Sequence, residues 1–201
     1  MLRAAPVTIP RVTLAVAALA ALVTLLYHWF GLAVPPALGW LLHADARHAA
    51  SDIGALLLAG FIIEPRCGTL RFGVWLLAGV GASHALLAIV YPHVPTLYGL
   101  SAAVWLLVGA GTTGVPAPNR LRWTVGAGLA AALTVEHLLP WRQVFSLGGA
   151  PPPEMNGVPM CPIPWVHAGC FALGLSLGSV GGLTTEKRSG TRAVPAAPRA
   201  T

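Results

Sequence analysis

The stretch Gly99 to Gly111 reads GLSAAVWLLVGAG, and the stretch Trp165 to Gly178 reads WVHAGCFALGLSLG. Both are apolar runs of a length that predicts helices. Each carries a reactive polar residue two positions after its start, Ser101 in the first run and His167 in the second. Because an imidazole is costly to bury in lipid, a polar pair at matching positions indicates a shared site.

The composition of the whole chain predicts a membrane protein. Hydrophobic residues make up 56% of the 201 residues and charged residues only 9%, and the mean hydropathy is +0.73. An average soluble domain has about 25% charged residues. The predicted fold class is therefore all-α, a polytopic membrane protein.

Six apolar runs lie between the prolines, glycines and arginines of the chain and are predicted to span the membrane. Crossing a hydrocarbon core of about 30 Å takes about 20 helical residues, so the second and fourth runs are short and indicate helices shielded by their neighbours. The first run has the look of a signal peptide but is long enough to cross, and we expect it to stay uncleaved. The spans are Val12–Val34, His48–Ile63, Phe72–Tyr91, Gly99–Gly114, Trp123–Leu139 and Trp165–Leu183.

The basic residues predict the orientation of these spans. With the amino terminus inside the cell, only Arg47 and Arg142 of the twelve lysines and arginines fall outside. Both termini are then cytoplasmic, and the second, fourth and sixth spans run from the outside inward. The expected location is the cytoplasmic (inner) membrane, with any site near the starts of those spans opening to the outer side.

The chain is predicted to form one membrane domain, residues 1–183, followed by a tail, Thr184 to Thr201. The tail is polar, basic and rich in proline and alanine, which predicts disorder. The orientation bias and this tail account for the formal charge of +6, so the charge gives no reason to expect a nucleic-acid partner.

Four polar residues are expected to meet in the outer third of the membrane. They are His48, Asp52, Ser101 and His167. Histidine or aspartate in a span costs about 2 to 3 kcal/mol on insertion scales, which favours a functional site.

The surroundings of Ser101 suit a nucleophile. Gly99 has no side chain and leaves room for a substrate backbone, and the unpaired amides at a helix start can stabilise an oxyanion. The small residues that would let the fourth and sixth spans pack closely are Ala102, Ala103, Gly169 and Gly174.

Together these motifs resemble the rhomboid family of intramembrane serine proteases, over nearly all six spans. The family's Gly-x-Ser-Gly motif corresponds to Gly99-Leu100-Ser101-Ala102, and its sixth-span histidine followed by glycines corresponds to His167, Gly169 and Gly174. The second-span signature corresponds to His48, Asp52, Gly60, Glu64 and Gly68, and His43 matches a histidine often found in the preceding loop.

The resemblance implies a six-helix rhomboid-like bundle that hydrolyses peptide bonds without a cofactor. Ser101 would be the nucleophile and His167 its base. His48 and the main chain at Gly99 and Leu100 would support the oxyanion, and Trp105 would take the place of an aromatic that stacks on the catalytic histidine.

Two residues depart from the family pattern. Ala102 replaces the second glycine, and Asp52 replaces an asparagine whose amide donates to the oxyanion. An ionised carboxylate only accepts hydrogen bonds and repels developing negative charge. Either Asp52 is neutral and donates through its O–H, or it pairs with a nearby histidine while His48 and the amides near Ser101 hold the oxyanion. We favour the second interpretation.

The divergent motifs look like those of the rhombosortase subgroup. That resemblance implies a protein-sorting protease and a membrane-anchored substrate with a carboxy-terminal Gly-Gly motif, an apolar helix and a basic end. The proline-rich loop Pro140 to Pro164 is a candidate cap over the site. Glu136 and His137 are expected at the outer end of the fifth span, either at the substrate's path or in an interfacial role.

Three alternatives stay open. The chain could be a catalytically inactive rhomboid relative that binds transmembrane helices, as Asp52 and Ala102 suggest. It could be a small-solute carrier or a haem-handling protein that uses its seven histidines. His43, His48 and Asp52 could imitate a metal site, but a fourth ligand is missing, and we expect no metal.

Overall fold

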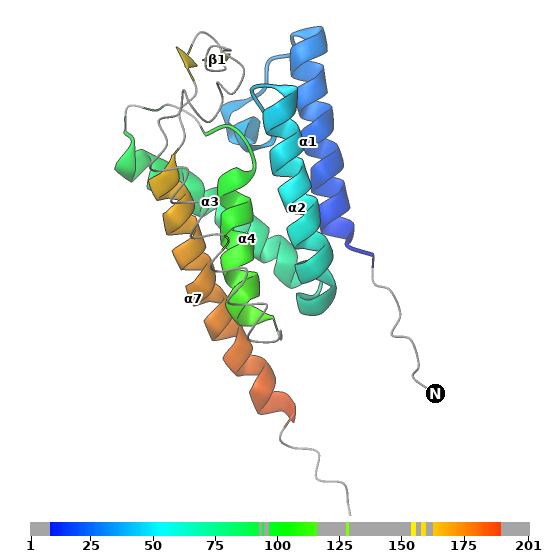
Figure 1. The fold of residues 1–201 in the computed structure, drawn as a ribbon, viewed down its shortest axis with the longest axis vertical. Helices are drawn as coiled ribbons and strands as arrows, with labels where there is room; N and C mark the ends of the chain where they lie inside the picture. The colour runs from blue at the N-terminus through cyan, green and yellow to red at the C-terminus, as the bar shows by residue number, and fades with distance from the viewer. Residues whose placement is uncertain are drawn as a thin grey trace, which may run out of the picture.

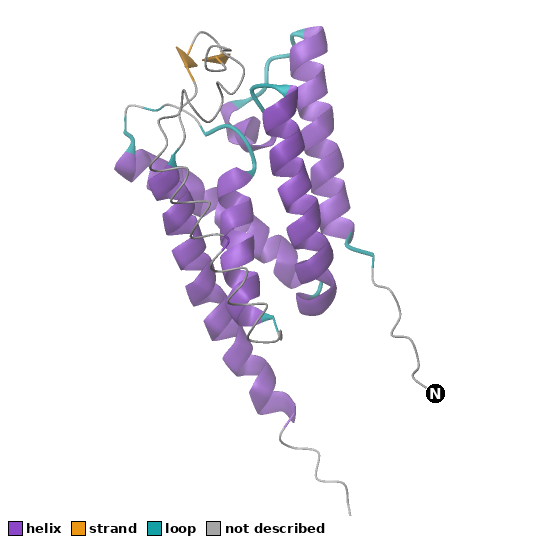
Figure 2. Ribbon diagram, viewed as in Figure 1, coloured by secondary structure: helices purple, strands orange, loops and turns teal. Residues whose placement is uncertain are grey.

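The computed structural model describes residues 9–92, 94, 97–115, 128, 154–155, 158–159 and 163–189. Figures 1 and 2 show that this part is helical apart from one short hairpin. Its elements are α1 (Arg11–Phe30), the 3-10 helix η1 (Pro36–Leu41), α2 (Ala46–Cys67), α3 (Thr69–Val90), α4 (Ser101–Gly114), β1 (Glu154–Met155), β2 (Val158–Pro159) and α7 (Pro164–Ser189). Strands β1 and β2 pair antiparallel.

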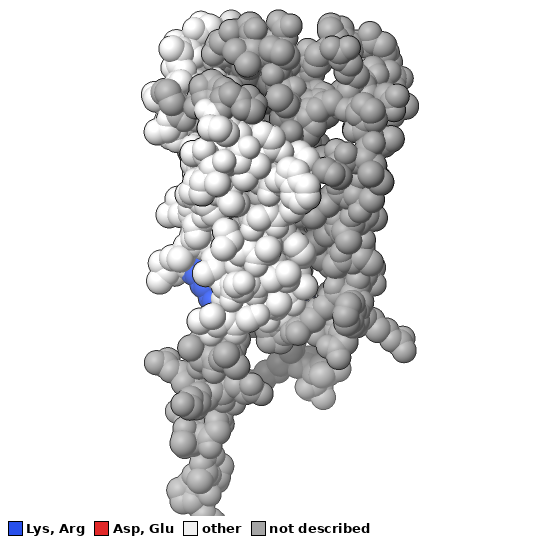
Figure 3. Space-filling model, turned by 90° about the vertical axis from the view of Figure 1, so that its left-hand side faces the viewer, with Lys and Arg blue, Asp and Glu red and all other residues white. Residues whose placement is uncertain are grey.

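Three of these helices, α1, α2 and α3, are long and apolar enough to cross a membrane. Large apolar side chains lie on their outer surfaces, among them Leu70, Ile89 and Trp29. The described atoms of the face in Figure 3 are uncharged except for one basic group towards its lower end. The predicted helical fold is confirmed for the described residues, and three of the predicted spans are helices able to cross a membrane. The fifth predicted span, Trp123–Leu139, lies outside the described residues apart from residue 128.

Helix α2 is longer than the short span predicted for His48–Ile63. Its 22 residues begin after Asp45, whose Oδ1 accepts a hydrogen bond of 2.7 Å from the His48 amide, and they continue through Pro65 to a glycine at φ 86°. The prediction ended the helix at the charged residues, but Glu64 is buried. A buried acid with partners does not end a membrane helix.

Glu64 is buried because it caps the start of α1. Its carboxylate accepts hydrogen bonds from the amides of Val12 (3.0 Å) and Thr13 (2.9 Å) and from the Thr13 hydroxyl (2.7 Å). The first amides of a helix have no partner within the helix, and their partial positive charge favours an anion. The second helix therefore fixes the start of the first.

The inward face of α1 is made of small and polar residues. Thr13, Ala17, Ala20 and Thr24 are its buried residues, spaced as one stripe along the helix. The leucines of α1 lie outside this stripe, and several are exposed. This arrangement is the reverse of a soluble helix and suits lipid outside with polar contacts inside.

Helix α4 packs lengthwise against α7 through glycines. A Cβ at Gly109, Gly174 or Gly178 would overlap backbone atoms of the facing helix, and Thr113 Oγ1 donates a 2.8 Å hydrogen bond to the Leu175 carbonyl. Of the residues predicted for this contact, Gly174 lies in it. A Cβ added at Gly169 would meet Leu86 of α3, and Ala103 lies against Gly79 of α3, so these two small residues permit a close approach to α3.

Helix α7 continues to Ser189. The first six residues of the predicted disordered tail, 184–189, are thus helical in the structure. Helices α2, α4 and α7 all begin towards the same end of the bundle, the upper end in Figure 1, and this is where the polar residues meet.

Candidate active site

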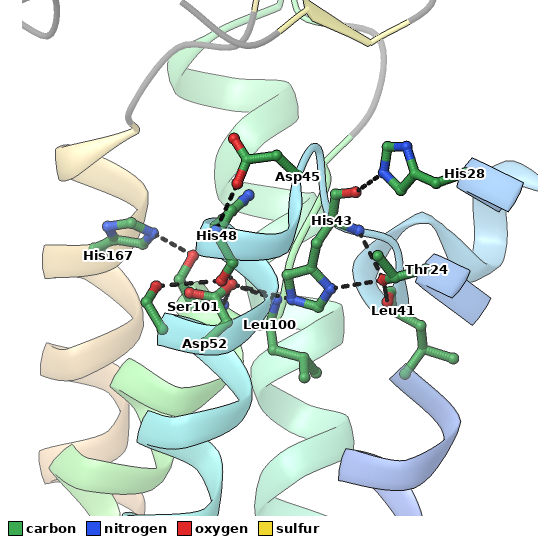
Figure 4. A network of polar contacts seen from close by, with 11 residues as sticks. Thr24, His28, Leu41, His43, Asp45, His48, Asp52, Leu100, Ser101 and His167 are labelled. Atoms are coloured by element: carbon green, nitrogen blue, oxygen red, sulfur yellow. Dashed lines mark hydrogen bonds and ion pairs between the residues drawn. The ribbon is translucent and has the colours of Figure 1, made fainter. Parts of the chain in front are cut away.

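Ser101 and His167 are in direct contact. Ser101 begins α4 and His167 lies in the first turn of α7. The Ser101 Oγ is 2.9 Å from His167 Nε2, across 66 positions of sequence, and Figure 4 shows the two side chains pointing toward each other. His167 is buried and Ser101 is half-buried. A hydroxyl that bonds an imidazole nitrogen can pass its proton to that nitrogen when it attacks an electrophile.

An aromatic side chain holds the plane of the His167 ring. Trp105, one turn after Ser101 on α4, stacks on His167 with ring centroids 6.1 Å apart and an angle of 24° between the planes. Phe171, one turn after His167, packs edge-on against the same Trp105. The sequence singled out Trp105 for this place, whereas Phe171 was missed, although its i+4 spacing from His167 is a usable signal.

Asp52 caps the start of α4 from outside that helix. Its Oδ2 accepts hydrogen bonds from the backbone amides of Leu100 (3.0 Å) and Ser101 (3.1 Å). Asp52 is 6% exposed, so its carboxylate is well placed to satisfy amides that the helix itself leaves unpaired. We call this arrangement the Asp52 clamp: the Asp52 carboxylate with the amides of Leu100 and Ser101.

Two histidines bring their Nε2 atoms to the same oxygen of the clamp. His43 Nε2 is 3.4 Å and His48 Nε2 is 3.3 Å from Asp52 Oδ2. Asp52 therefore pairs with histidines, as one of the two interpretations expected. The same interpretation expected the amides near Ser101 to be open to an oxyanion. In the structure the amides of Leu100 and Ser101 already donate to the Asp52 carboxylate.

Gly99 lets Asp52 and His48 approach the main chain at the clamp. Its φ of 89° lies in the left-handed region, which side chains rarely adopt. A Cβ at this position would stand 2.8 Å from Asp52 Oδ2 and 3.0 Å from His48 Cε1 and Nε2. The predicted room for a substrate backbone is thus filled by Asp52 and His48, which approach the bare main chain.

Replacing Gly99 by alanine is expected to lower the free energy of unfolding by about 2 to 4 kcal/mol, from backbone strain and overpacking together. Thermal unfolding in detergent measures the change. The matched control is Gly81→Ala on α3, where an added Cβ meets no atom within 4 Å. Equal stability of the two variants would show that Gly99 is not needed for the clamp.

A further layer of polar contacts lies behind Asp52. His43 is fully buried between η1 and α2, and its Nδ1 is 3.1 Å from the hydroxyl of Thr24 on α1. His28 Nε2 donates a 2.9 Å hydrogen bond to the His43 carbonyl. The sequence analysis did not single out Thr24. Its place among the small and polar residues that repeat along α1 could have indicated that it faces inward.

Among the residues that the structure describes, no group of three His, Cys, Asp or Glu side chains is arranged to hold a metal ion. His43 and His48 both direct a ring nitrogen at one carboxylate oxygen and not at a common vacant point. Glu136 and His137, and most of the loop Pro140 to Pro164, lie outside the described residues.

No protein-family model, no curated protein and no solved structure matches this chain.

Proposed function

We propose that this protein is an intramembrane serine protease of the rhomboid type, which cleaves membrane-anchored proteins with a Ser–His dyad. One observation carries the proposal: the 2.9 Å contact between Ser101 Oγ and His167 Nε2 at the starts of two helices. Both residues belong to a chain with three helices apolar enough to span a membrane. A paired nucleophile and base among such helices favour a reaction over a packing role.

The proposed reaction is acyl transfer in two steps. His167 Nε2 takes the Ser101 proton while Oγ attacks the carbonyl carbon of the scissile peptide bond, and the imidazolium then protonates the leaving amine. In the second step His167 removes a proton from water, which attacks the ester, and Ser101 regains its proton. Trp105 contributes by holding the imidazole ring facing Ser101.

The Asp52 clamp supports this reaction by geometry and opposes it by charge. It fixes the turn from Gly99 to Ser101, which sets where the nucleophile begins. Its negative charge lies beside the place where the carbonyl oxygen becomes an anion, and like charges repel. His48, whose side chain is 20% exposed beside the clamp, is the proposed donor to that oxygen.

Asp52→Asn is expected to raise kcat about tenfold, which corresponds to about 1.4 kcal/mol of transition-state stabilisation. The amide oxygen still accepts from Leu100 and Ser101, the charge is removed, and a donor is added. Asp52→Ala serves as the matched variant and is expected to lower kcat, since both amides lose their partner. If Asp52→Asn and Asp52→Ala lower kcat equally, the negative charge of Asp52 is itself required, contrary to this expectation. Initial rates of reporter cleavage in liposomes measure both.

The proposed substrate class follows the rhombosortase-like motifs. It is a membrane-anchored protein with a carboxy-terminal Gly-Gly motif, an apolar helix and a basic end. We place the protein in the cytoplasmic membrane with both termini inside and the site opening to the outer side, because ten of the twelve basic residues then lie inside. On this proposal the lipid bilayer surrounds its membrane-spanning helices.

The test is cleavage of a reporter by the purified protein in liposomes. A reporter with Gly-Gly, an apolar helix and terminal arginines is expected to be cut near the Gly-Gly pair, and a Val-Val reporter more slowly. Equal rates for the two reporters would contradict the Gly-Gly preference but not the proposed protease activity. Cleavage of neither reporter would count against the proposed reaction.

A second candidate is a catalytically inactive rhomboid relative that binds transmembrane helices. The observation that favours it is the occupation of the Leu100 and Ser101 amides by Asp52, which leaves them no open anion position. The two candidates differ in whether Ser101 is nucleophilic.

A further inference from the structure

Thr24 and His43 form a buried pair on the side of Asp52 away from Ser101. His43 is 0% and Thr24 is 7% exposed. Figure 4 shows the side chains in the order Thr24, His43, Asp52 and Ser101, from α1 across to α4. None of the proposed reaction steps uses Thr24 or His43, so their burial needs another explanation.

Each ring nitrogen of His43 faces one defined group. Nε2 is 3.4 Å from Asp52 Oδ2, and Nδ1 is 3.1 Å from Thr24 Oγ1. Nε2 makes no hydrogen bond, so its contact with Asp52 is electrostatic, and a proton on Nε2 makes that contact favourable. A ring turned over by 180° would remove Nε2–H from the carboxylate, and the contact at Nδ1 opposes that turn.

Thr24 meets His43 at two points. Its hydroxyl faces Nδ1 and also accepts a 3.3 Å hydrogen bond from the His43 backbone amide, while it lies 3.4 Å from the Leu41 carbonyl. The hydroxyl thus ties both the ring and the main chain of His43 to α1. In a buried setting a polar group that loses its partner is costly, so the ring has one favoured orientation.

We propose that Thr24 is a positioning residue for the site. Through its hydroxyl it holds the His43 ring with Nε2 beside Asp52 Oδ2, in an electrostatic contact of 3.4 Å outside hydrogen-bond geometry, and it thereby keeps this carboxylate on the amides of Leu100 and Ser101. Helix α1, which supplies no reacting atom, sets the start of α4 in this way. The effect on turnover rests on the proposed function, whereas the effect on the clamp does not.

Thr24→Val removes the hydroxyl and keeps the shape of the side chain. It is expected to speed hydrogen exchange at the amides of Leu100 and Ser101, with no change at Leu106 and Leu107 in the middle of α4. It is also expected to lower kcat by about tenfold to a hundredfold, because a small displacement of a nucleophile has effects of that size. KM should not change, since Thr24 does not touch substrate, and Thr24→Ser should restore both properties.

The matched control is Thr13→Val, the other buried threonine of the same stripe, which bonds Glu64 and not His43. It is expected to leave kcat and the exchange of Leu100 and Ser101 unchanged. The proposal would be overturned if Thr24→Val had the same kcat and the same hydrogen exchange at Leu100 and Ser101 as the wild type. It would also be overturned if Thr13→Val changed the exchange of these two amides as much as Thr24→Val does. If the wild type cleaves no reporter, the protease proposal fails, and the exchange data still decide the role of Thr24.

Discussion

Ser101→Ala is expected to abolish cleavage of a membrane-anchored reporter, with a loss of about 10⁴-fold or more, because the attacking oxygen is removed. The protein should still fold, since the clamp bonds the backbone amide of residue 101 and not its hydroxyl. Reporter cleavage in liposomes measures the rate, and thermal unfolding in detergent checks the fold.

The control for this variant is Ser176→Ala. Ser176 lies exposed on α7, and its hydroxyl bonds back to the Ala172 carbonyl of its own helix. Its loss should leave the rate unchanged. Full cleavage by a folded Ser101→Ala protein would end the proposal of a serine nucleophile.

His167→Ala is expected to lower kcat by about 10⁴-fold or more, since Ser101 then has no base to take its proton. The double variant Ser101→Ala/His167→Ala should be no slower than either single variant, because the two residues act as a unit. His84→Ala is the matched control: His84 bonds the Val80 carbonyl of its own helix α3 and lies outside the site. A double variant whose losses add would indicate that the two residues act separately.

The meeting of Ser101 with His167 could be predicted from sequence because two simple facts determine it. Both residues lie at the starts of apolar runs, and the distribution of basic residues predicts that those runs are parallel. Parallel neighbours with polar residues at equal positions bring them to one level. An apolar run determines well how far along a helix a polar residue lies. The same runs predict the helical fold class.

The rotation of each helix about its axis was harder to predict, as the packing residues show. Gly169 and Gly174 are five residues apart on one helix, yet Gly169 faces α3 and Gly174 faces α4. Small residues permit a close approach without naming the partner. The same limit explains why Ala103 was assigned to α7 and lies against α3.

The surroundings of Gly99 were hard to predict for a related reason. A glycine before a nucleophile reads as space for a substrate, but Asp52 and His48 of α2 fill that space. Only the contact between α2 and α4 shows this, and 48 positions separate Asp52 from Leu100. The length of α2 also depended on a contact, that of Glu64 with the start of α1. Helix α2 thus supplies two buried carboxylates, and each caps a different helix.

Covalent labelling tests most directly whether Ser101 is a nucleophile activated by His167. The purified protein is treated with a serine-directed fluorophosphonate, and its peptides are mapped by mass spectrometry. We expect one adduct, on Ser101, that is absent in Ser101→Ala and forms much more slowly in His167→Ala. A folded wild-type protein that stays unlabelled at Ser101 would contradict the claim and favour the inactive, helix-binding relative.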